Sequence, residues 1–247
     1  MAIKIVNLRK EYNDVIAVNN LNLEINEGEL FSLLGVNGAG KTTTIKMLAT
    51  LTKPTSGDAF IDGYSVVTED EKVKELIDIS MQETAIARKL TVEENIEFYA
   101  SLSGQTKEEM AESKNYVYKV FGLEQVKNKL AYKLSGGWQR KLSIALALVT
   151  KPKILFLDEP TLGLDVIARR ELWKTIKSLK GKMTIILTTH YMEEAQELSD
   201  RIGIMKDGNL LFVGEKEKLY ELTNKNNVEE AFIQVVSGGD EDEKFSI

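Results

Sequence analysis

The sequence contains no cysteine, one histidine and three prolines in 247 residues. The absence of cysteine excludes disulfide scaffolds, thiol nucleophiles and cysteine-ligated metal sites, and a single histidine, His190, excludes multi-histidine zinc sites. No apolar run approaches the roughly 20 residues that span a bilayer. The first residues lack the basic start, apolar middle and cleavage site of a secretory signal. These absences favour a cytoplasmic protein.

Neither sign of charge dominates the chain. Lys and Arg total 32 against 38 Asp and Glu, which gives a net charge of −6. Because a protein that contacts many phosphates of a nucleic acid needs a basic face, this charge balance argues against a nucleic-acid partner. Hydrophobic residues make up 43% of the sequence, enough to bury the core of one large domain.

The N-terminal part of the sequence has the two-residue period of β-strands. Apolar and polar residues alternate over the first thirty positions, and a continuous apolar strand at 30–34 leads into Gly35. Helical spacing follows from 41 to about 51. Residues 57–67 predict an antiparallel hairpin with Asp62-Gly63 at its turn.

The period changes to 3.6 residues between about 84 and 149, which predicts an inserted group of helices. Two strands with apolar residues on both faces follow at 154–157 and 184–188, separated by a helix near 166–179. Such strands, alternating with helices, indicate a parallel α/β sheet. A strand-turn-strand at 202–212, turning at Asp207-Gly208, completes the pattern.

These patterns predict a single domain over 1–235 with an acidic tail at 236–247. Within the domain, 1–83 and 150–220 form the sheets and their helices, and 84–149 forms the helical insertion.

Residues 35–42 match the pattern G-x-x-x-x-G-K-[ST] between a strand and a helix. Its glycines let backbone N–H groups surround phosphate oxygens, and the helix that follows adds its positive end. Lys41 is then expected to reach the β- and γ-phosphates and Thr42 to ligate Mg²⁺. The alternative is a glycine-rich turn before a helix. The expected nucleotide-contacting residues of this loop are Gly35, Val36, Asn37, Gly38, Ala39, Gly40, Lys41, Thr42 and Thr43.

Two carboxylates, Asp158 and Glu159, end the strand at 154–157. Ligands bind at the carboxyl ends of parallel strands, so these acids are expected beside the phosphate loop. Asp158 would hold Mg²⁺ and Glu159 would take a proton from the attacking water. The alternative is a pair of solvated acids at a strand end.

A second anion-binding feature occurs where Ser135, Gly136 and Gly137 open a helix of the insertion. Exposed N–H groups, a hydroxyl and the helix dipole favour an anion there. A serine that only caps its helix is the alternative.

Together these motifs resemble the nucleotide-binding subunit of ABC (ATP-binding cassette) transporters, from Ile3 to about Val235. The nearest pattern is that of bacterial and archaeal drug, antibiotic and sodium exporters of the ABC-2 type. The resemblance implies a P-loop NTPase (RecA-like) parallel-sheet core with an N-terminal antiparallel β-subdomain and an inserted α-helical subdomain. The motifs occur in the family's order: Tyr12, 35–43, Gln82, 134–137, Asp158-Glu159, Leu164-Asp165 and His190.

The resemblance also implies roles for single residues. Tyr12 is similar to the aromatic residue that stacks on adenine, with Val18 beside the sugar and base. Gln82 is similar to the glutamine that joins the Mg²⁺ shell and links the core to the insertion. His190 is similar to the histidine that contacts the γ-phosphate and positions water.

In the resembled family two chains pack head to tail around ATP. The 135–137 segment of one chain would close over the nucleotide held by Lys41 of the other, with Asp165 across the interface. The partners expected are a second such chain and a transmembrane permease received near Gln82 and 83–90. This places the chain peripherally on the cytoplasmic face of the cell membrane.

The motif at 190–195 favours export of drugs, antibiotics, lipids or ions. An importer ATPase, and an ABC ATPase with soluble partners such as one in cluster assembly, stay open as alternatives. The sequence departs from the family at Trp138, where glutamine is most often found.

Overall fold

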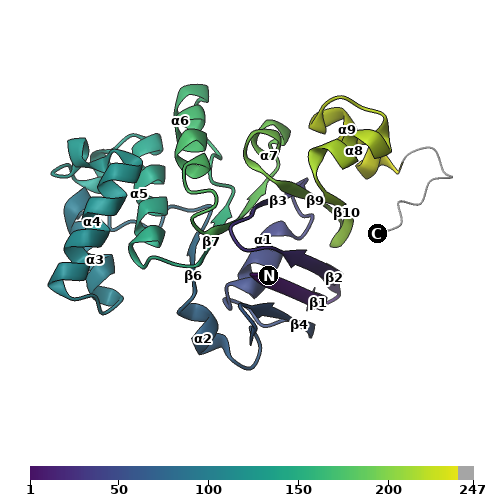
Figure 1. The fold of residues 1–247 in the computed structure, drawn as a ribbon, viewed down its shortest axis with the longest axis horizontal. Coiled ribbons are helices and arrows are strands. Elements are labelled where there is room, and N and C mark those ends of the chain that lie inside the picture. Colours follow the sequence, from purple (N-terminus) through teal and green to yellow (C-terminus); the bar gives the residue numbers. More distant parts are fainter. Residues whose placement is uncertain (239–247) are drawn as a thin grey trace.

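The computed structural model describes residues 1–238 and is shown in Figure 1. Within these residues ten strands form two sheets. The smaller sheet has the order β2-β1-β4-β5, with antiparallel pairing throughout. Its strands are β1 (Ile3–Tyr12), β2 (Val15–Ile25), β4 (Ser56–Ile61) and β5 (Tyr64–Ser65).

The larger sheet has the order β10-β9-β3-β8-β7-β6. Only the β9–β10 pair is antiparallel, and every residue of β3, β7 and β8 is buried. Because both faces of these strands are buried, their sequences are continuous apolar runs. Its strands are β3 (Leu30–Gly35), β6 (Ile77–Ser80), β7 (Ile154–Asp158), β8 (Thr184–Thr189), β9 (Arg201–Lys206) and β10 (Asn209–Gly214).

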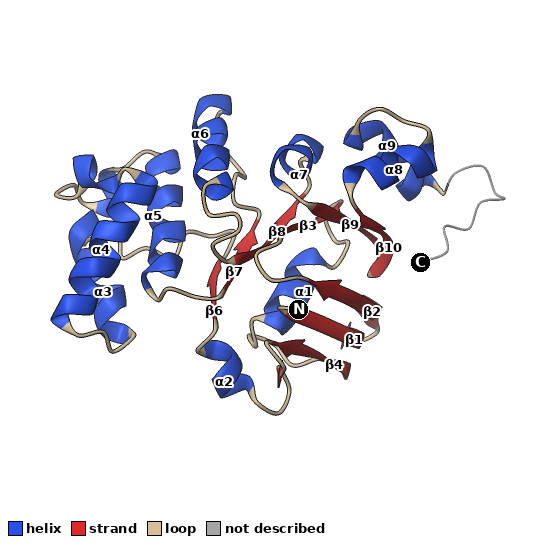
Figure 2. Cartoon of the chain, in the orientation of Figure 1, coloured by secondary structure: helices blue, strands red, loops and turns tan. Residues whose placement is uncertain are grey.

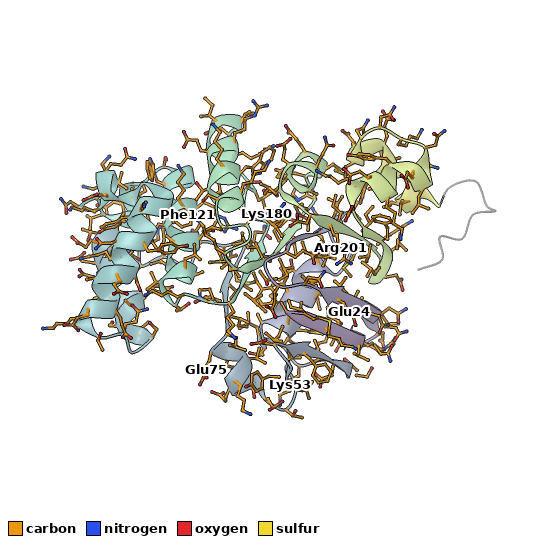
Figure 3. All side chains as sticks on the ribbon, in the orientation of Figure 1. Glu24, Lys53, Glu75, Phe121, Lys180 and Arg201 are labelled. Atoms are coloured by element: carbon orange, nitrogen blue, oxygen red, sulfur yellow. The ribbon has the colours of Figure 1, made fainter. Side chains whose placement is uncertain are left out.

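Helix α1 (Lys41–Leu48) lies between the two sheets (Figure 2). Its apolar residues Ile45, Met47 and Leu48 are buried in one core with side chains from both sheets. The sheets are also joined directly by Arg201, which is labelled in Figure 3. Its Nη1 atom donates to the carbonyl of Glu24 on β2 at 3.1 Å and to the carboxylate of Glu29 at 3.2 Å.

The helical insertion lies to the left of the sheets in Figure 1. The first two helices begin at capping boxes, Thr91 with Glu94 and Thr106 with Glu109. The third, α5, packs its buried residues against both of them and against the larger sheet. The insertion comprises α3 (Val92–Leu102), α4 (Lys107–Phe121), the 3₁₀ turns Leu123–Val126 and Ala131–Lys133, and α5 (Gly136–Val149).

The remaining helices cover the edges and the second face of the larger sheet. Helices α8 and α9 pack with β9 and β10 around Phe212 and Phe232. These remaining helices are α2 (Asp70–Lys74), α6 (Val166–Lys177), α7 (Met192–Leu198), α8 (Lys216–Thr223) and α9 (Val228–Ser237). Among residues 1–238, no helix is both long and apolar enough to cross a membrane.

The predicted fold class is confirmed: a parallel core sheet, an antiparallel N-terminal sheet and an inserted group of helices. Helix α1 ends earlier than expected, at Leu48, because Thr50 adopts a left-handed conformation with φ of 58°. Of the acidic tail predicted at 236–247, residues 239–247 lie outside the described part of the chain.

Candidate functional site

The loop between β3 and α1 contains two glycines with left-handed backbone, Gly38 and Gly40, with φ of 82° and 102°. A Cβ atom on Gly40 would lie 2.3 Å from the carbonyl oxygen of Ala17, so only glycine fits. The loop leads directly into the N-terminus of α1, whose first N–H groups have no partner within the helix. The segment therefore has the backbone geometry of an anion-binding loop.

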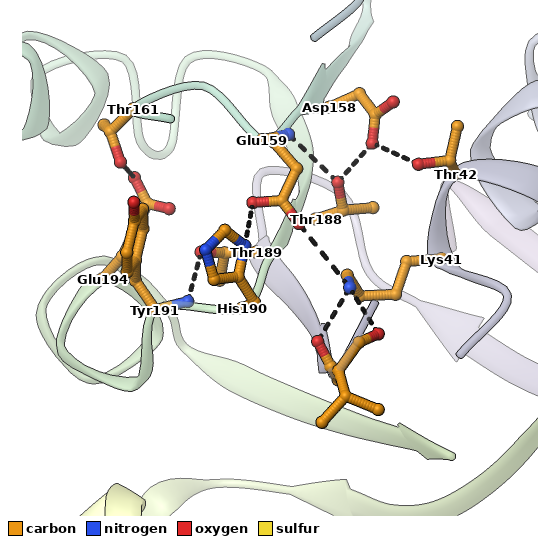
Figure 4. Close-up of polar contacts among 12 residues, drawn as sticks. Lys41, Thr42, Asp158, Glu159, Thr161, Thr188, Thr189, His190, Tyr191 and Glu194 are labelled. Atoms are coloured by element: carbon orange, nitrogen blue, oxygen red, sulfur yellow. Dashed lines mark hydrogen bonds and ion pairs between the residues drawn. The ribbon is translucent and has the colours of Figure 1, made fainter. Parts of the chain in front are cut away.

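Lys41, the first residue of α1, is buried at the base of this loop. Its Nζ atom donates to the carbonyls of Gly35 at 2.7 Å and Val36 at 3.1 Å, and it lies 3.6 Å from Oε1 of Glu159. Burial lowers the pKa of the Lys41 amine, while Glu159 and Asp158 oppose that shift. The amine thus links the loop to the carboxylate of Glu159, which directly follows β7 (Figure 4).

Asp158 ends β7 and is fully buried. Its Oδ1 atom accepts hydrogen bonds from the hydroxyls of Thr42 at 3.0 Å and Thr188 at 2.5 Å. Its Oδ2 atom is also buried and has no hydrogen-bond partner in the part of the chain that the structure describes. A buried carboxylate oxygen without a partner is costly unless a ligand satisfies it.

Glu159 has a left-handed backbone with φ of 49°, and its N–H donates to the carbonyl and hydroxyl of Thr188. Its Oε2 atom lies 2.8 Å from Nδ1 of His190, which directly follows β8. The carboxylate of Glu159 is therefore held between Lys41 on one oxygen and His190 on the other (Figure 4).

A cavity of about 530 Å³ lies against the loop, Lys41, Glu159 and His190, whereas the buried Asp158 does not line it. Most of the predicted site residues line it together, although they come from distant parts of the sequence. The lining comprises Tyr12, Ala17, Asn37, Gly38, Ala39, Gly40, Lys41, Thr42, Thr43, Gln82, Glu159, Leu162 and His190. Tyr12, at the end of β1, leaves 45% of its surface exposed at the cavity mouth.

Two residues of this lining, Ala17 and Leu162, were not predicted. No sequence motif distinguishes them, and they reach the cavity only because β2 and the loop after β7 pass beside it. Val18, which the resemblance places next to the sugar and base, does not line the cavity. Its side chain is fully buried in the core, and the neighbouring Ala17, which is partly exposed, lines the cavity instead.

The segment of Ser135, Gly136 and Gly137 does not line the cavity either. Ser135 and Gly136 are exposed at the start of α5. Ser135 occupies the N-cap position of α5, but its side chain makes no capping hydrogen bond. Its hydroxyl and the first N–H groups of α5 are therefore available to a ligand outside this chain.

Asp165 is exposed at the N-terminus of α6 and lies outside the cavity. Its Oδ1 atom accepts hydrogen bonds from the backbone N–H groups of Ile167 and Ala168, each at 2.9 Å. In this chain Asp165 therefore caps a helix.

Residues 18–162 match the family model described as ABC transporter. This match covers more than half of the chain, which therefore belongs to the ABC transporter family. Within that family it is an ATP-hydrolysing ATPase domain.

One curated relative is the phospholipid-transporting ATPase ABCA3 of Homo sapiens, 43% identical over 216 residues. The aligned part covers 86% of this chain and 13% of the relative, so the chain spans a small part of that protein.

Two solved structures share the fold. The first is an ATP-binding subunit of an ABC transporter, with a TM-score of 0.84 and 25% identity, covering 95% of this chain and 99% of that one. The second is a dimeric ATP-binding cassette in a post-hydrolysis state with bound ADP and Pi. Its TM-score is 0.77 and its identity 29%, with 86% of this chain and 98% of that one covered.

Proposed function

We propose that the chain powers a transmembrane exporter by hydrolysing ATP in the cavity between the phosphate loop, Tyr12 and His190. The observation that carries the proposal is the arrangement of one carboxylate, Glu159, between Lys41 and His190 beside an anion-binding loop. In this arrangement adenine stacks on Tyr12, and the phosphates are surrounded by the loop N–H groups.

Nucleotide binding would change the partners of Lys41. The phosphate oxygens compete with the carbonyls of Gly35 and Val36 and with Glu159 for its amine. Oε1 of Glu159 is then free to accept a proton from the water that attacks the γ-phosphorus, and ADP leaves as the P–O bond breaks. His190 holds the other oxygen of Glu159 and lines the cavity, where it would contact the γ-phosphate.

The residues present fit a Mg²⁺ ion. Asp158 offers a buried carboxylate oxygen that has no partner among residues 1–238, Thr42 offers a hydroxyl beside it, and Gln82 lines the cavity together with Thr42. Mg²⁺ bound through few protein ligands completes its shell with phosphate oxygens and water. The ion supplies neutralisation of the phosphate charge, and Asp158, Thr42 and Gln82 would hold it there.

The working form of the site would be a head-to-tail dimer. Ser135 and Gly136 are exposed, uncapped and outside the cavity that contains Lys41, so their donors are free to bind the nucleotide of a second chain. Closure around two ATP molecules and opening after hydrolysis would form the power stroke. The dimeric state of the cassette with 29% identity supports a working form of two chains.

The proposed cargo is a lipid or another amphiphile. The 43% identity to a phospholipid-transporting ATPase supports that class, and the motif at 190–195 supports export. The permease would dock where the insertion meets the core, near Gln82 and 83–90.

The first test is capture of the permease. Tagged protein with Glu159→Gln is purified with ATP and Mg²⁺ from detergent-solubilised membranes of its host. A multi-spanning partner in stoichiometric amount is the expected result. Recovery in the soluble fraction with a soluble partner would overturn the transporter proposal.

The cargo is tested next with the wild-type chain and the permease identified in this way, reconstituted together in vesicles that contain a fluorescent phospholipid. ATP-dependent movement of the lipid between leaflets is expected, and Glu159→Gln should abolish it. Wild-type complex that hydrolyses ATP without moving the lipid would refute the lipid cargo.

A further inference from the structure

Arg140 is 96% buried in α5, five residues after Ser135, and the roles described so far do not use it. Its guanidinium donates four hydrogen bonds, all to backbone carbonyls outside its own helix. Nε donates to Pro160 at 2.7 Å, and Nη2 donates to Asp158 at 2.9 Å. Nη1 donates to Met81 at 2.5 Å and to Gln82 at 3.1 Å.

The four acceptors surround two groups of the site. The carbonyls of Asp158 and Pro160 belong to the residues on either side of Glu159. Those of Met81 and Gln82 begin the loop that follows β6. The rigid, planar guanidinium of Arg140 thus connects the backbone beside the proposed base, Glu159, with the backbone of the proposed Mg²⁺ ligand, Gln82.

The backbone at Glu159 needs such support. Its φ of 49° is a left-handed conformation, which is strained for a residue other than glycine. Such a conformation persists only where several contacts fix it. The hydrogen bonds from Arg140 to the carbonyls of Asp158 and Pro160 fix the peptide group that precedes Glu159 and the one that follows Pro160.

Stability alone does not account for a buried arginine here. Within residues 1–238 its guanidinium makes no ion pair, and burial lowers its pKa to about 10 despite the nearby Asp158 and Glu194. A buried cation held only by neutral acceptors is a poor source of stability compared with an apolar side chain of similar volume.

We propose that Arg140 is a positioning residue for ATP hydrolysis: it fixes the backbone of Glu159 and Gln82 to the helix that begins at Ser135. The inference rests on the catalytic role proposed above for Glu159. Because α5 is a continuous helix from Gly136, any displacement of its N-terminus by a bound nucleotide is transmitted to both loops through the guanidinium.

The test compares two substitutions. Arg140→Lys keeps the charge but offers one nitrogen, which cannot span carbonyls on two loops. Arg140→Met fills the space without leaving an unpaired charge, and so it is expected to fold. Both should lower kcat about tenfold to a hundredfold, the effect of misplacing a reacting group by about 1 Å. KM for ATP, and the affinity for a fluorescent ATP analogue, should stay within about twofold of wild type.

The matched control is Arg170→Lys at an exposed position on α6, which should leave kcat unchanged. Wild-type kcat in both Arg140 variants would overturn the proposal. A lower nucleotide affinity together with a lower thermal unfolding midpoint would also overturn it, because a purely structural residue would show that pattern.

A double-mutant cycle separates this inference from the role of Glu159. If Arg140 acts through Glu159, Arg140→Lys should reduce kcat little further in a Glu159→Gln background. A full further loss in that background would overturn positioning through Glu159. If Glu159→Gln lowers kcat while the Arg140 variants keep the wild-type kcat, the positioning role of Arg140 is overturned and the role of Glu159 as the base stands.

Discussion

Nδ1 of His190 lies 2.8 Å from Oε2 of Glu159, although the two residues are 31 positions apart in the sequence. Strands β7 and β8 are neighbours in the parallel sheet, and both residues directly follow their strands. The sheet order therefore brings a carboxylate and an imidazole together at one edge. The same carboxylate faces Lys41, so its two oxygens are fixed before nucleotide binds.

The role of Glu159 is tested by Glu159→Gln. Turnover should fall about 10²- to 10⁴-fold, the usual effect of removing a general base. Nucleotide binding should persist and the ATP-bound dimer should accumulate, which size-exclusion chromatography with ATP measures. Glu193→Gln, at an exposed position on α7, is the control and should retain wild-type turnover. Phosphate release by Glu159→Gln at the wild-type rate would refute the assignment.

Lys41→Met should weaken ATP binding by about tenfold to a hundredfold. The physical reason is the loss of charge-assisted hydrogen bonds to phosphate, each of which contributes about 1.5 to 3 kcal/mol. Titration with a fluorescent ATP analogue measures the effect. Lys46→Met, on the same helix but outside the cavity, should bind nucleotide normally. Equal affinity in the two variants would contradict the proposed phosphate contact.

Gly136→Ala tests the contact between two chains. A Cβ atom on Gly136 would meet nothing within 4 Å in its own chain. The monomer should therefore keep its thermal unfolding midpoint, whereas ATP-dependent dimerisation and turnover should fall because the added methyl group lies where the second nucleotide would pack. Gly40→Ala is the contrasting variant, since its Cβ would clash with Ala17 within the chain and disrupt nucleotide binding directly. Normal dimerisation by Gly136→Ala would count against the head-to-tail arrangement.

The burial of Asp78, in β6, predicts that the free energy of unfolding depends on pH. Burial raises its pKa from 3.8 to about 6, although it accepts hydrogen bonds from the Ile79 N–H and the Thr150 hydroxyl. Because the pKa of Asp78 is higher in the folded than in the unfolded protein, protonated Asp78 contributes stability to the fold. This contribution is complete below about pH 3.8 and is lost as the pH rises through about 6.

Asp78→Asn should therefore raise the free energy of unfolding at pH 8. The gain should be about 1 kcal/mol for this partly exposed group, or about 2 to 4 °C in the unfolding midpoint. The difference should vanish below pH 4, and Asp14→Asn at an exposed turn should show no such dependence. A pH-independent difference would assign the effect to packing instead of charge.

Local patterns predicted much of the fold. Both predicted turns are present, and each has left-handed backbone at two successive residues: Asp62 and Gly63, and Asp207 and Gly208. These turns are set by residues adjacent in sequence, so they could be predicted. Strand β6 was not predicted, because its four residues are too few to show a period, and helix α8 was not predicted either. The roles of the site residues stay predictions until the variants above are measured.

The sequence by itself determined the strand, loop and helix around Lys41 and the two acids at the end of β7, because each depends on neighbouring residues alone. Only the tertiary structure decided which of these groups meet. The hydroxyl of Thr42 reaches Asp158 across 116 positions, and Arg140 reaches Gln82 and Pro160 from a different subdomain. Such contacts follow from the order of strands in the sheet and from the packing of α5 against it. No short-range periodicity encodes either of these.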